Sequence, residues 1–160
     1  MAYELPQYRD TVRAEWGDYN GHLRDAFYGL IFSYATDALM DRLGLDAVCR
    51  ARTQCSIYTV EYHINFLQEV KVGAEVQVTT QVLAADAKRL HVYHAMTLLD
   101  GAEGSTDPVA VSEQMLLHVD TRGPKSAVFT PEVMLLVRAM AAEHAGLARP
   151  AYAGRVIRLP

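Results

Sequence analysis

The sequence predicts an α+β fold in which a curved antiparallel sheet wraps around one long central helix. One stretch, from about His22 to Leu43, repeats apolar residues at three- and four-residue steps, as an amphipathic helix does. The stretches on either side of it are rich in β-branched and aromatic residues and are separated by turn formers. A sheet and a helix that each have one apolar face bury both faces by packing against each other.

The first predicted strand is short. Tyr8, Asp10 and Val12 alternate with Arg9, Thr11 and Arg13 along it. The strand ends before the run Trp16-Gly17-Asp18-Tyr19-Asn20-Gly21, which is dense in turn formers, so we expect a loop there. The long helix follows from His22, and Gly44 ends it.

Four longer strands are predicted after a short link. They are Gln54–Leu67, Glu75–Ala84, Leu90–Leu99 and Val109–Asp120. One face of the first of these strands carries an apolar row, which we expect to cover the helix: Tyr58, Val60, Tyr62, Ile64 and Phe66.

The connections between the later strands predict an antiparallel meander. Both Ala85-Asp86-Ala87-Lys88 and the segment Asp100–Ser105 have hairpin character. A final helix begins at Pro131, a favoured first-turn residue, and ends before Gly146. We expect the tail from Ala148 onward to be loosely held.

Composition narrows the function. The chain has 160 residues with 15 basic and 19 acidic side chains, a formal charge of −4, which speaks against a nucleic-acid binder. No stretch approaches the ~18 apolar residues of a membrane span, and the start lacks the pattern of a signal peptide. We therefore expect a single cytoplasmic domain over residues 1–160 without a membrane partner. Cys49 and Cys55 lack the spacing of a redox or metal pair and are expected to be free thiols.

Several catalytic mechanisms are excluded by missing motifs. The sequence contains no GxSxG elbow, GxGxxG, P-loop or HExxH motif. His91 and His94 are three apart on a predicted strand and therefore point to opposite faces, which gives no support for a metal site. His118 and His144 are isolated, and we expect them to be surface or hydrogen-bonded core residues.

The loop before the long helix is the remaining place for chemistry. It brings Asp18, Asn20, Gly21 and His22 to a helix N-terminus, where unpaired amides and a partial positive charge can bind an oxyanion. Asp18 could act there as a general base or a nucleophile. The alternative interpretation is structural: Asp18 or Asn20 only caps the helix, and Gly21 only turns the chain.

The run Asp18-Tyr19-Asn20-Gly21-His22-Leu23-Arg24-Asp25-Ala26-Phe27-Tyr28 resembles the D-x-x-G-H-[hydrophobic]-N-N-x-x-Y signature of hotdog-fold acyl-CoA thioesterases of the 4-hydroxybenzoyl-CoA thioesterase type. The stretches from Val60 to Leu67 and from Ala85 to His91 are similar to thioesterases of carnitine breakdown, which act on betainyl-CoA. The resemblance covers nearly the whole chain and implies a hotdog fold. Arg24 and Asp25 depart from the two asparagines of many members.

The resemblance implies the hydrolysis of an acyl-CoA thioester without a metal or cofactor. The family's catalytic carboxylate falls on Asp18, and the oxyanion-binding helix start falls near Gly21 to Leu23. Asp18 would activate water or attack directly, and these two routes stay open. His22 would orient Asp18 or contact the substrate, or it simply caps or packs.

Further residues are candidates for substrate binding. Four aromatic residues near the motif could hold a trimethylammonium group: Trp16, Tyr19, Phe27 and Tyr28. Asn20 lies among them and is also a candidate for substrate binding. Glu61 and His63 share one strand face, and in hotdog proteins this strand lies near a partner's helix start. Lys88 and Arg89, in a hairpin, could contact the phosphates of CoA, or they only aid solubility.

Two rival functions and an assembly remain to be considered. Hotdog hydratases carry D-x-N-P-[IL]-H, but here Gly21 replaces the proline and His22 comes one residue too soon. A non-catalytic acyl-CoA-binding module would keep the pocket without needing Asp18. The long outer strands leave an edge to cover, so we expect a homodimer or homotetramer with active sites at the subunit boundary.

Overall fold

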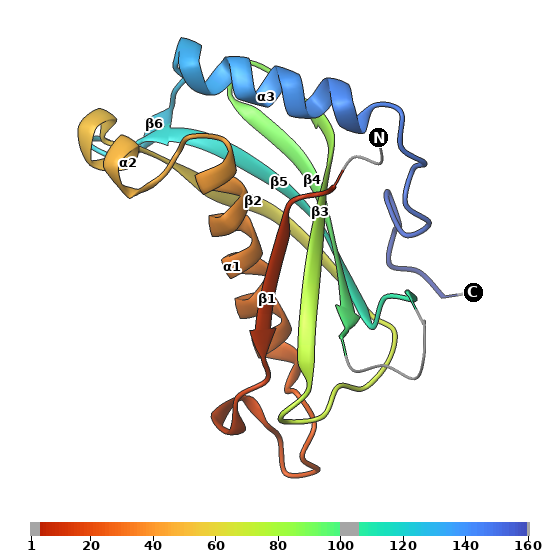
Figure 1. Ribbon diagram of the computed structural model, residues 1–160. Helices are drawn as coiled ribbons and strands as arrows, with labels where there is room; N and C mark the ends of the chain where they lie inside the picture. The colour runs from red at the N-terminus through yellow and green to blue at the C-terminus, as the bar shows by residue number, and fades with distance from the viewer. Residues whose placement is uncertain (1–3, 100–105, 160) are drawn as a thin grey trace.

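The computed structural model describes residues 4–99 and 106–159. It confirms the predicted α+β class and the order of one strand, a long helix, four strands and a last helix (Figure 1). The elements are β1 (Gln7–Thr11), the 3-10 turn η1 (Ala14–Trp16), α1 (Asp25–Arg42), α2 (Ala47–Thr53), β2 (Cys55–Phe66), β3 (Glu75–Ala85), β4 (Arg89–Leu98), β5 (Ala110–Asp120), β6 (Lys125–Ser126) and α3 (Pro131–His144).

The strands form one antiparallel sheet in the order β1-β3-β4-β5-β2, and the short β6 pairs with β5. The expected hairpin between β3 and β4 is present. The expected connection Asp100–Ser105 lies outside the described residues. β1 and β2 are therefore the two edges of the sheet, each with only one neighbouring strand among the described residues.

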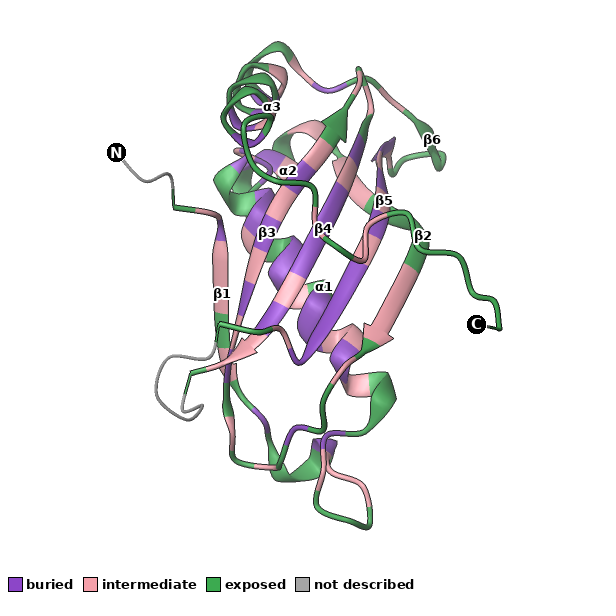
Figure 2. Ribbon diagram, turned by 90° about the vertical axis from the view of Figure 1, so that its right-hand side faces the viewer, coloured by how far each residue is buried: buried purple, intermediate pink, exposed green. Residues whose placement is uncertain are grey.

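α1 lies along one face of the sheet, as the apolar periodicity predicts. Figure 2 shows the sheet in front of this helix, with buried residues on both. The side chains of Ile31, Phe32 and Leu39 are 0% exposed. Gly44 follows the helix with φ of +75°, a conformation that glycine adopts without strain, so the predicted stop is confirmed.

The apolar row of β2 covers the helix only in part, because Tyr62, Ile64 and Phe66 face it whereas Tyr58 does not. A β-bulge shifts the register between Thr59 and Glu61, so that Tyr58 lies opposite Leu117 whereas Tyr62 lies opposite Gln114. One extra residue reverses the alternation of side chains. Tyr58 therefore points to the outer face and Tyr62 to the helix face. Because β2 is an edge strand, the exposed apolar residues of the row include Tyr58 (44%), Val60 (55%), Tyr62 (43%) and Phe66 (53%).

Two segments at the ends of the sheet differ from the sequence-based expectation. The link after α1 contains the short helix α2, which the side chain of Asp46 caps by accepting the N–H of Cys49. Contrary to the expectation from the sequence, the tail after Ala148 is not loosely held, because it is fixed to the sheet at Gly154. The N–H of Gly154 donates to the Glu113 carboxylate at 2.6 Å on the outer face of the sheet. Both cysteines are free, as expected.

The histidines lie where the sequence places them. His91 faces outward and pairs with Glu113 at 2.6 Å, whereas His94 faces the helix and is fully buried. His118 and His144 are hydrogen-bonded core residues, through the Ala127 carbonyl and the Val82 N–H respectively. Among the described residues, no helix is long and apolar enough to cross a membrane.

Candidate functional site

The motif loop, residues 17–24, is a tight turn closed by its own backbone. The Asp18 N–H donates to the His22 carbonyl at 2.8 Å, and the Gly21 N–H donates to the Asp18 carbonyl at 3.1 Å. This turn requires φ of +76° at Gly21, which explains a glycine there. The loop thus holds Asp18 in a fixed place.

α1 begins at Asp25, three residues later than the sequence predicts. The Leu23 N–H donates to Val70, and His22 forms a β-bridge with Lys71, so these residues are extended rather than helical. The residue that precedes the helix is Arg24, and its side chain makes no capping hydrogen bond. The interpretation of Asp18 or Asn20 as a helix cap is therefore wrong.

The Asp18 carboxylate binds its own loop instead. Its Oδ1 atom accepts the N–H groups of Asn20 at 2.8 Å and His22 at 3.1 Å. These hydrogen bonds, led by the one from His22, lower the pKa of Asp18 below the ordinary aspartate value. Both hydrogen bonds end on Oδ1, which leaves Oδ2 available to a water molecule or a carbonyl carbon.

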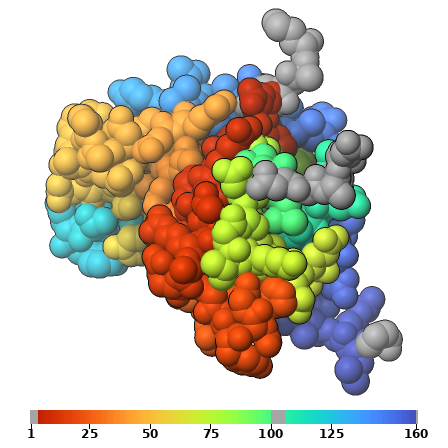
Figure 3. Space-filling model, turned by 60° about the horizontal axis from the view of Figure 1, so that its bottom comes forward, coloured from red at the N-terminus to blue at the C-terminus, as the bar shows by residue number. Residues whose placement is uncertain are grey.

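A cavity of about 330 Å³ opens between this loop, the start of α1 and the end of β2. It is lined by Asp18, Asn20, His22, Leu23, Asp25, Tyr28, Phe66, Leu67, Gln68 and Glu69. Figure 3 shows this end of the molecule, where the motif loop and the segment after β2 lie side by side. The structure thus brings together four of the sequence-predicted site residues: Asp18, Asn20, His22 and Tyr28.

The lining of this cavity is acidic. Asp18, Asp25 and Glu69 contribute carboxylates, and no lysine or arginine is among the described lining residues. The Nε2 atom of His22 lies 3.5 Å from the Glu69 carboxylate, so His22 turns toward Glu69 rather than toward the Asp18 carboxylate. A cavity of this charge favours a cationic or neutral group over an anionic one.

Sequence reasoning missed the residues that reach the cavity from the end of β2. Phe66 meets Tyr28 edge-on, with ring centroids 5.1 Å apart, and the Gln68 carbonyl lies 3.5 Å from the Tyr28 hydroxyl. These residues are about 40 positions from the motif and carry no local signal of their own. The pairing of residues 21–23 with residues 70–72 brings them to the loop.

Other predicted residues lie elsewhere in the subunit. Trp16 is 3% exposed and stacks on Phe27, so both belong to the core. Tyr19 is 92% exposed on the loop and does not line the cavity. Glu61 and His63 line a separate cavity on the outer face of the sheet, of about 420 Å³.

Lys88 and Arg89 lie at the opposite end of the sheet from Asp18. The 11 residues of β3 span roughly 35 Å between these two ends. Arg89 forms an ion pair with Asp86 at 2.6 Å, and Lys88 donates to Ser126 at 3.1 Å. A CoA molecule in the cavity beside Asp18 would meet these two side chains only if they came from another subunit.

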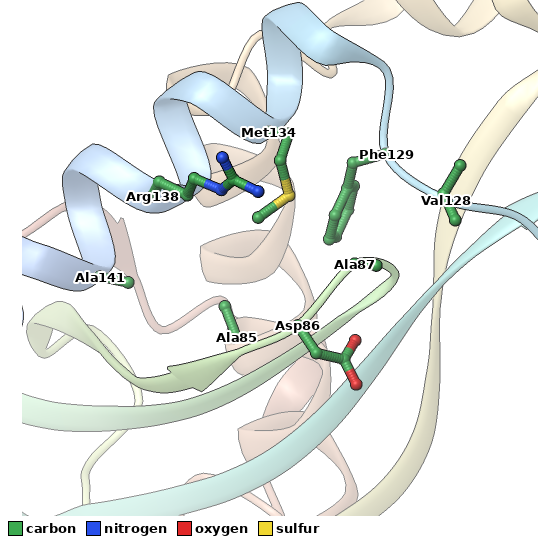
Figure 4. A pocket seen from close by; sticks show the side chains of 8 residues that line it. All are labelled: Ala85, Asp86, Ala87, Val128, Phe129, Met134, Arg138 and Ala141. Atoms are coloured by element: carbon green, nitrogen blue, oxygen red, sulfur yellow. The ribbon is translucent and has the colours of Figure 1, made fainter.

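The same end of the sheet holds another cavity of about 420 Å³ under α3 (Figure 4). Met134 and Arg138 from the helix and Phe129 surround it, whereas the Asp86 carboxylate points away from α3. Asp86 accepts the N–H groups of Lys88 and Arg89 and pairs with the Arg89 guanidinium, so it is fully used in holding the hairpin. This cavity offers no group suited to acyl transfer.

Curated relatives match nearly the whole length of this chain. A curated relative, the betainyl-CoA thioesterase of Pseudomonas aeruginosa, is 54% identical over 160 residues, which is 100% of this chain and 98% of the relative. An L-carnitine dehydrogenase/betainyl-CoA thioesterase of Agrobacterium fabrum is 41% identical over 98% of this chain, but the match spans only 31% of that longer protein.

Solved structures show the same fold. A candidate thioesterase from Pseudomonas putida KT2440 superposes with a TM-score of 0.83 at 50% identity, covering 100% of this chain and 99% of that chain. A Staphylococcus aureus protein in complex with CoA superposes with a TM-score of 0.89 at 26% identity, covering 100% and 98%. The family model of the thioesterase-like superfamily matches residues 12–137. The chain therefore belongs to the thioesterase-like superfamily and has its hotdog fold.

Proposed function

We propose that this thioesterase hydrolyses betainyl-CoA to glycine betaine and CoA. The observation that carries the proposal is the cavity beside Asp18, which joins an ionised carboxylate and a helix start to an acidic lining. The full-length similarity to the Pseudomonas aeruginosa betainyl-CoA thioesterase supports the same substrate.

The carbonyl oxygen of the thioester would lie against the amides of the first turn of α1. The side chain of Arg24 does not cap the helix, but the N–H of Ala26 donates to the Asp25 carboxylate and the N–H of Phe27 to the Arg24 carbonyl, both at 2.9 Å, so the thioester oxygen would replace these acceptors at the two amides. They would stabilise the negative charge that develops on the oxygen as the carbonyl carbon is attacked.

Asp18 would supply the attack by one of two routes. As a general base, it takes a proton from water while the water oxygen adds to the carbonyl carbon. As a nucleophile, its oxygen displaces the thiolate of CoA and forms a mixed anhydride, which water then hydrolyses. In both routes the C–S bond breaks and CoA leaves as a thiolate that takes up a proton. The reaction consumes only water.

The acidic lining matches the charge of the betainyl group. Asp18, Asp25 and Glu69 would attract a trimethylammonium, whereas an anionic acyl group would be repelled. Trp16 and Phe27 cannot form the aromatic cage considered from the sequence, because they stack on each other in the core. The aromatic residues that do line the cavity are Tyr28 and Phe66.

We further propose a homo-oligomer, a dimer or a tetramer, that pairs through the β2 edge. Within the described residues β2 has one neighbouring strand only, and its exposed apolar row would be covered by a second copy. Such a pairing would place the active sites at the subunit boundary and would let Lys88 and Arg89 of one subunit approach the CoA of another. We also propose that the protein is cytoplasmic.

A substrate panel tests the function. The wild-type protein is assayed with betainyl-CoA, with short aliphatic acyl-CoAs and with benzoyl-CoA, and the released thiol is measured. We expect betainyl-CoA to have the highest kcat/KM. Faster turnover of benzoyl-CoA would contradict the proposed substrate. Binding without thiol release would favour the non-catalytic module, and hydration of an enoyl-CoA would favour the hydratase.

A further inference from the structure

A second, smaller cavity lies beside the candidate site, between α1 and β2. It has a volume of about 210 Å³ and is lined by Gly29, Ser33, Thr59, Tyr62 and Gln114. None of these lining side chains is charged, and Tyr62 is the only aromatic one among them. The two cavities share no lining residue, but Gly29 directly follows Tyr28 on α1 and Tyr62 lies four residues before Phe66 on β2, so this cavity is the next one along the same two elements.

Tyr62 reaches this cavity because of the bulge in β2. The register shift puts Tyr62 opposite Gln114, whose side chain is buried and lies near the Thr36 hydroxyl of α1. The phenol oxygen of Tyr62 comes to 2.7 Å from the point where a Cβ would stand on Gly29. The ring therefore lies against α1 at a place where the helix has no side chain.

The size of the betainyl group fits the distance between the two places. A carbonyl held at Asp25, the first residue of α1, is about 6 Å along the helix axis from Gly29. The quaternary nitrogen is two bonds from the carbonyl carbon, or about 2.5 Å, and its methyl groups extend about 1.5 Å further. The methyl carbons would lie about 4 Å from the carbonyl carbon, and the remaining distance of about 2 Å is the van der Waals radius of a methyl group, so the methyl surface would end near Gly29 and Tyr62.

We propose that the ring of Tyr62 binds the quaternary ammonium of the acyl group and sets the preference for a cationic substrate. This inference rests on the proposed function and adds the residue that recognises the substrate. A quaternary ammonium has no N–H to donate, so the negative face of an aromatic ring is the contact available to it in an uncharged cavity.

The nearby carboxylates and the ring have different roles in this proposal. Asp18, Asp25 and Glu69 line the neighbouring cavity and attract the cation over several ångströms. The ring of Tyr62 makes the direct contact, which a neutral group of the same shape cannot use. Burial raises the pKa of Tyr62 to about 12, so the phenol stays protonated near neutral pH.

The test compares two substrates of the same shape. Betainyl-CoA and 3,3-dimethylbutyryl-CoA differ only in the nitrogen or carbon that carries the three methyl groups. The ratio of their kcat/KM values is measured for the wild type, Tyr62→Leu and Tyr62→Phe. We expect Tyr62→Leu to lower the ratio by roughly 2- to 30-fold, the range of a cation–π contact, and Tyr62→Phe to keep it. Tyr152→Leu is the matched control, because Tyr152 is a half-buried tyrosine in the C-terminal tail, away from β2 and from both cavities.

A second pair of variants tests the same contact without removing the ring. In Gly29→Ala the new Cβ would collide with the phenol oxygen at 2.7 Å and displace Tyr62, so the ratio should fall. The double variant Gly29→Ala/Tyr62→Phe removes that oxygen, and the nearest remaining ring atom is then at 3.6 Å, an ordinary contact. The double variant should restore the ratio.

The outcomes separate this inference from the proposed function. An unchanged ratio in both Tyr62→Leu and Gly29→Ala would overturn the role of Tyr62. An equal loss with both substrates would also overturn it, because the ring would then contribute shape alone. If the wild type does not hydrolyse betainyl-CoA, the proposed function itself fails, whatever the variants do.

Discussion

The carboxylate of Asp18 accepts the backbone N–H of His22 at 3.1 Å, so the proposed reactive group is also the group that closes its own loop. The same oxygen accepts the N–H of Asn20. Both hydrogen bonds favour the charged form of the carboxylate. The loop therefore keeps Asp18 ionised and correctly placed before any substrate arrives.

The first prediction concerns the pH dependence of hydrolysis. The carboxylate form of Asp18 is present above its pKa and is lost as the pH falls through it. Because the pKa lies below the ordinary 3.8 of aspartate, kcat/KM should show no acid limb due to Asp18 between about pH 5 and 8. A pH profile with circular dichroism at each pH measures this. An acid limb near neutral pH that disappears in Asp18→Asn would contradict it.

The second prediction compares two glycines. Gly21 has φ of +76° with nothing within 4 Å of the position that a methyl group would take, so only backbone strain opposes an alanine there. Gly21→Ala should lower the free energy of unfolding by roughly 1–2 kcal/mol. Gly123 has equally open space and no positive φ, so Gly123→Ala should stay within about 0.5 kcal/mol of the wild type. Urea unfolding measures both, and equal effects of the two variants would show that the loop is not strained.

The third prediction concerns His94, which is enclosed by Thr36 and Thr80. Its ring nitrogens lie 3.1 Å and 2.8 Å from the two hydroxyls, and burial lowers its pKa to about 3. The unfolded chain binds a proton there near pH 6.5, whereas the folded chain does not. Stability is therefore lost as the pH falls from about 6.5 toward 3, by up to about 1.4 kcal/mol per pH unit.

The pH dependence of His94 can be separated from that of the other histidines. The free energy of unfolding is measured in urea between about pH 5 and 7.5 for the wild type and for His94→Gln. The variant is expected to be less stable but to lose less stability on acidification. Parallel pH profiles for the two proteins would mean that His94 is not the titrating group.

The fourth prediction tests the proposed assembly. Light scattering should give a mass at least twice the 17.8 kDa of one chain. Val60→Lys puts a charge on the β2 edge and should shift the protein toward monomer, whereas Val128→Lys, at a similarly exposed valine outside β2, should not. A wild-type mass near that of one chain would contradict the proposal.

The parts of the fold set by local pattern were predictable from the sequence. The apolar stripe of α1, Gly44 at its end and Pro131 at the start of α3 each follow from rules that act within a few residues. The motif loop was predictable as the place of the candidate site for the same reason, since its turn formers and its acid lie next to each other in sequence.

The features that depend on distant pairing were not predictable. The bulge in β2 has no glycine or proline to mark it, and it reversed the facing of Tyr58 relative to Tyr62. The bridge between His22 and Lys71 delayed the start of α1 to Asp25 and brought Glu69 to the cavity. Both features arise from contacts between segments far apart in the chain, which periodicity does not record.

The central claim is that the Asp18 carboxylate drives the hydrolysis of betainyl-CoA. The most direct measurement is the kcat/KM of Asp18→Asn on this substrate, with Asp41→Asn, an exposed change farther along α1, as the control. Asparagine retains an oxygen that can accept the N–H of His22, so the melting temperature should change little. The account predicts a fall of about 100-fold or more in kcat/KM for Asp18→Asn and wild-type activity for Asp41→Asn. A folded Asp18→Asn protein that keeps most of its kcat would contradict the account.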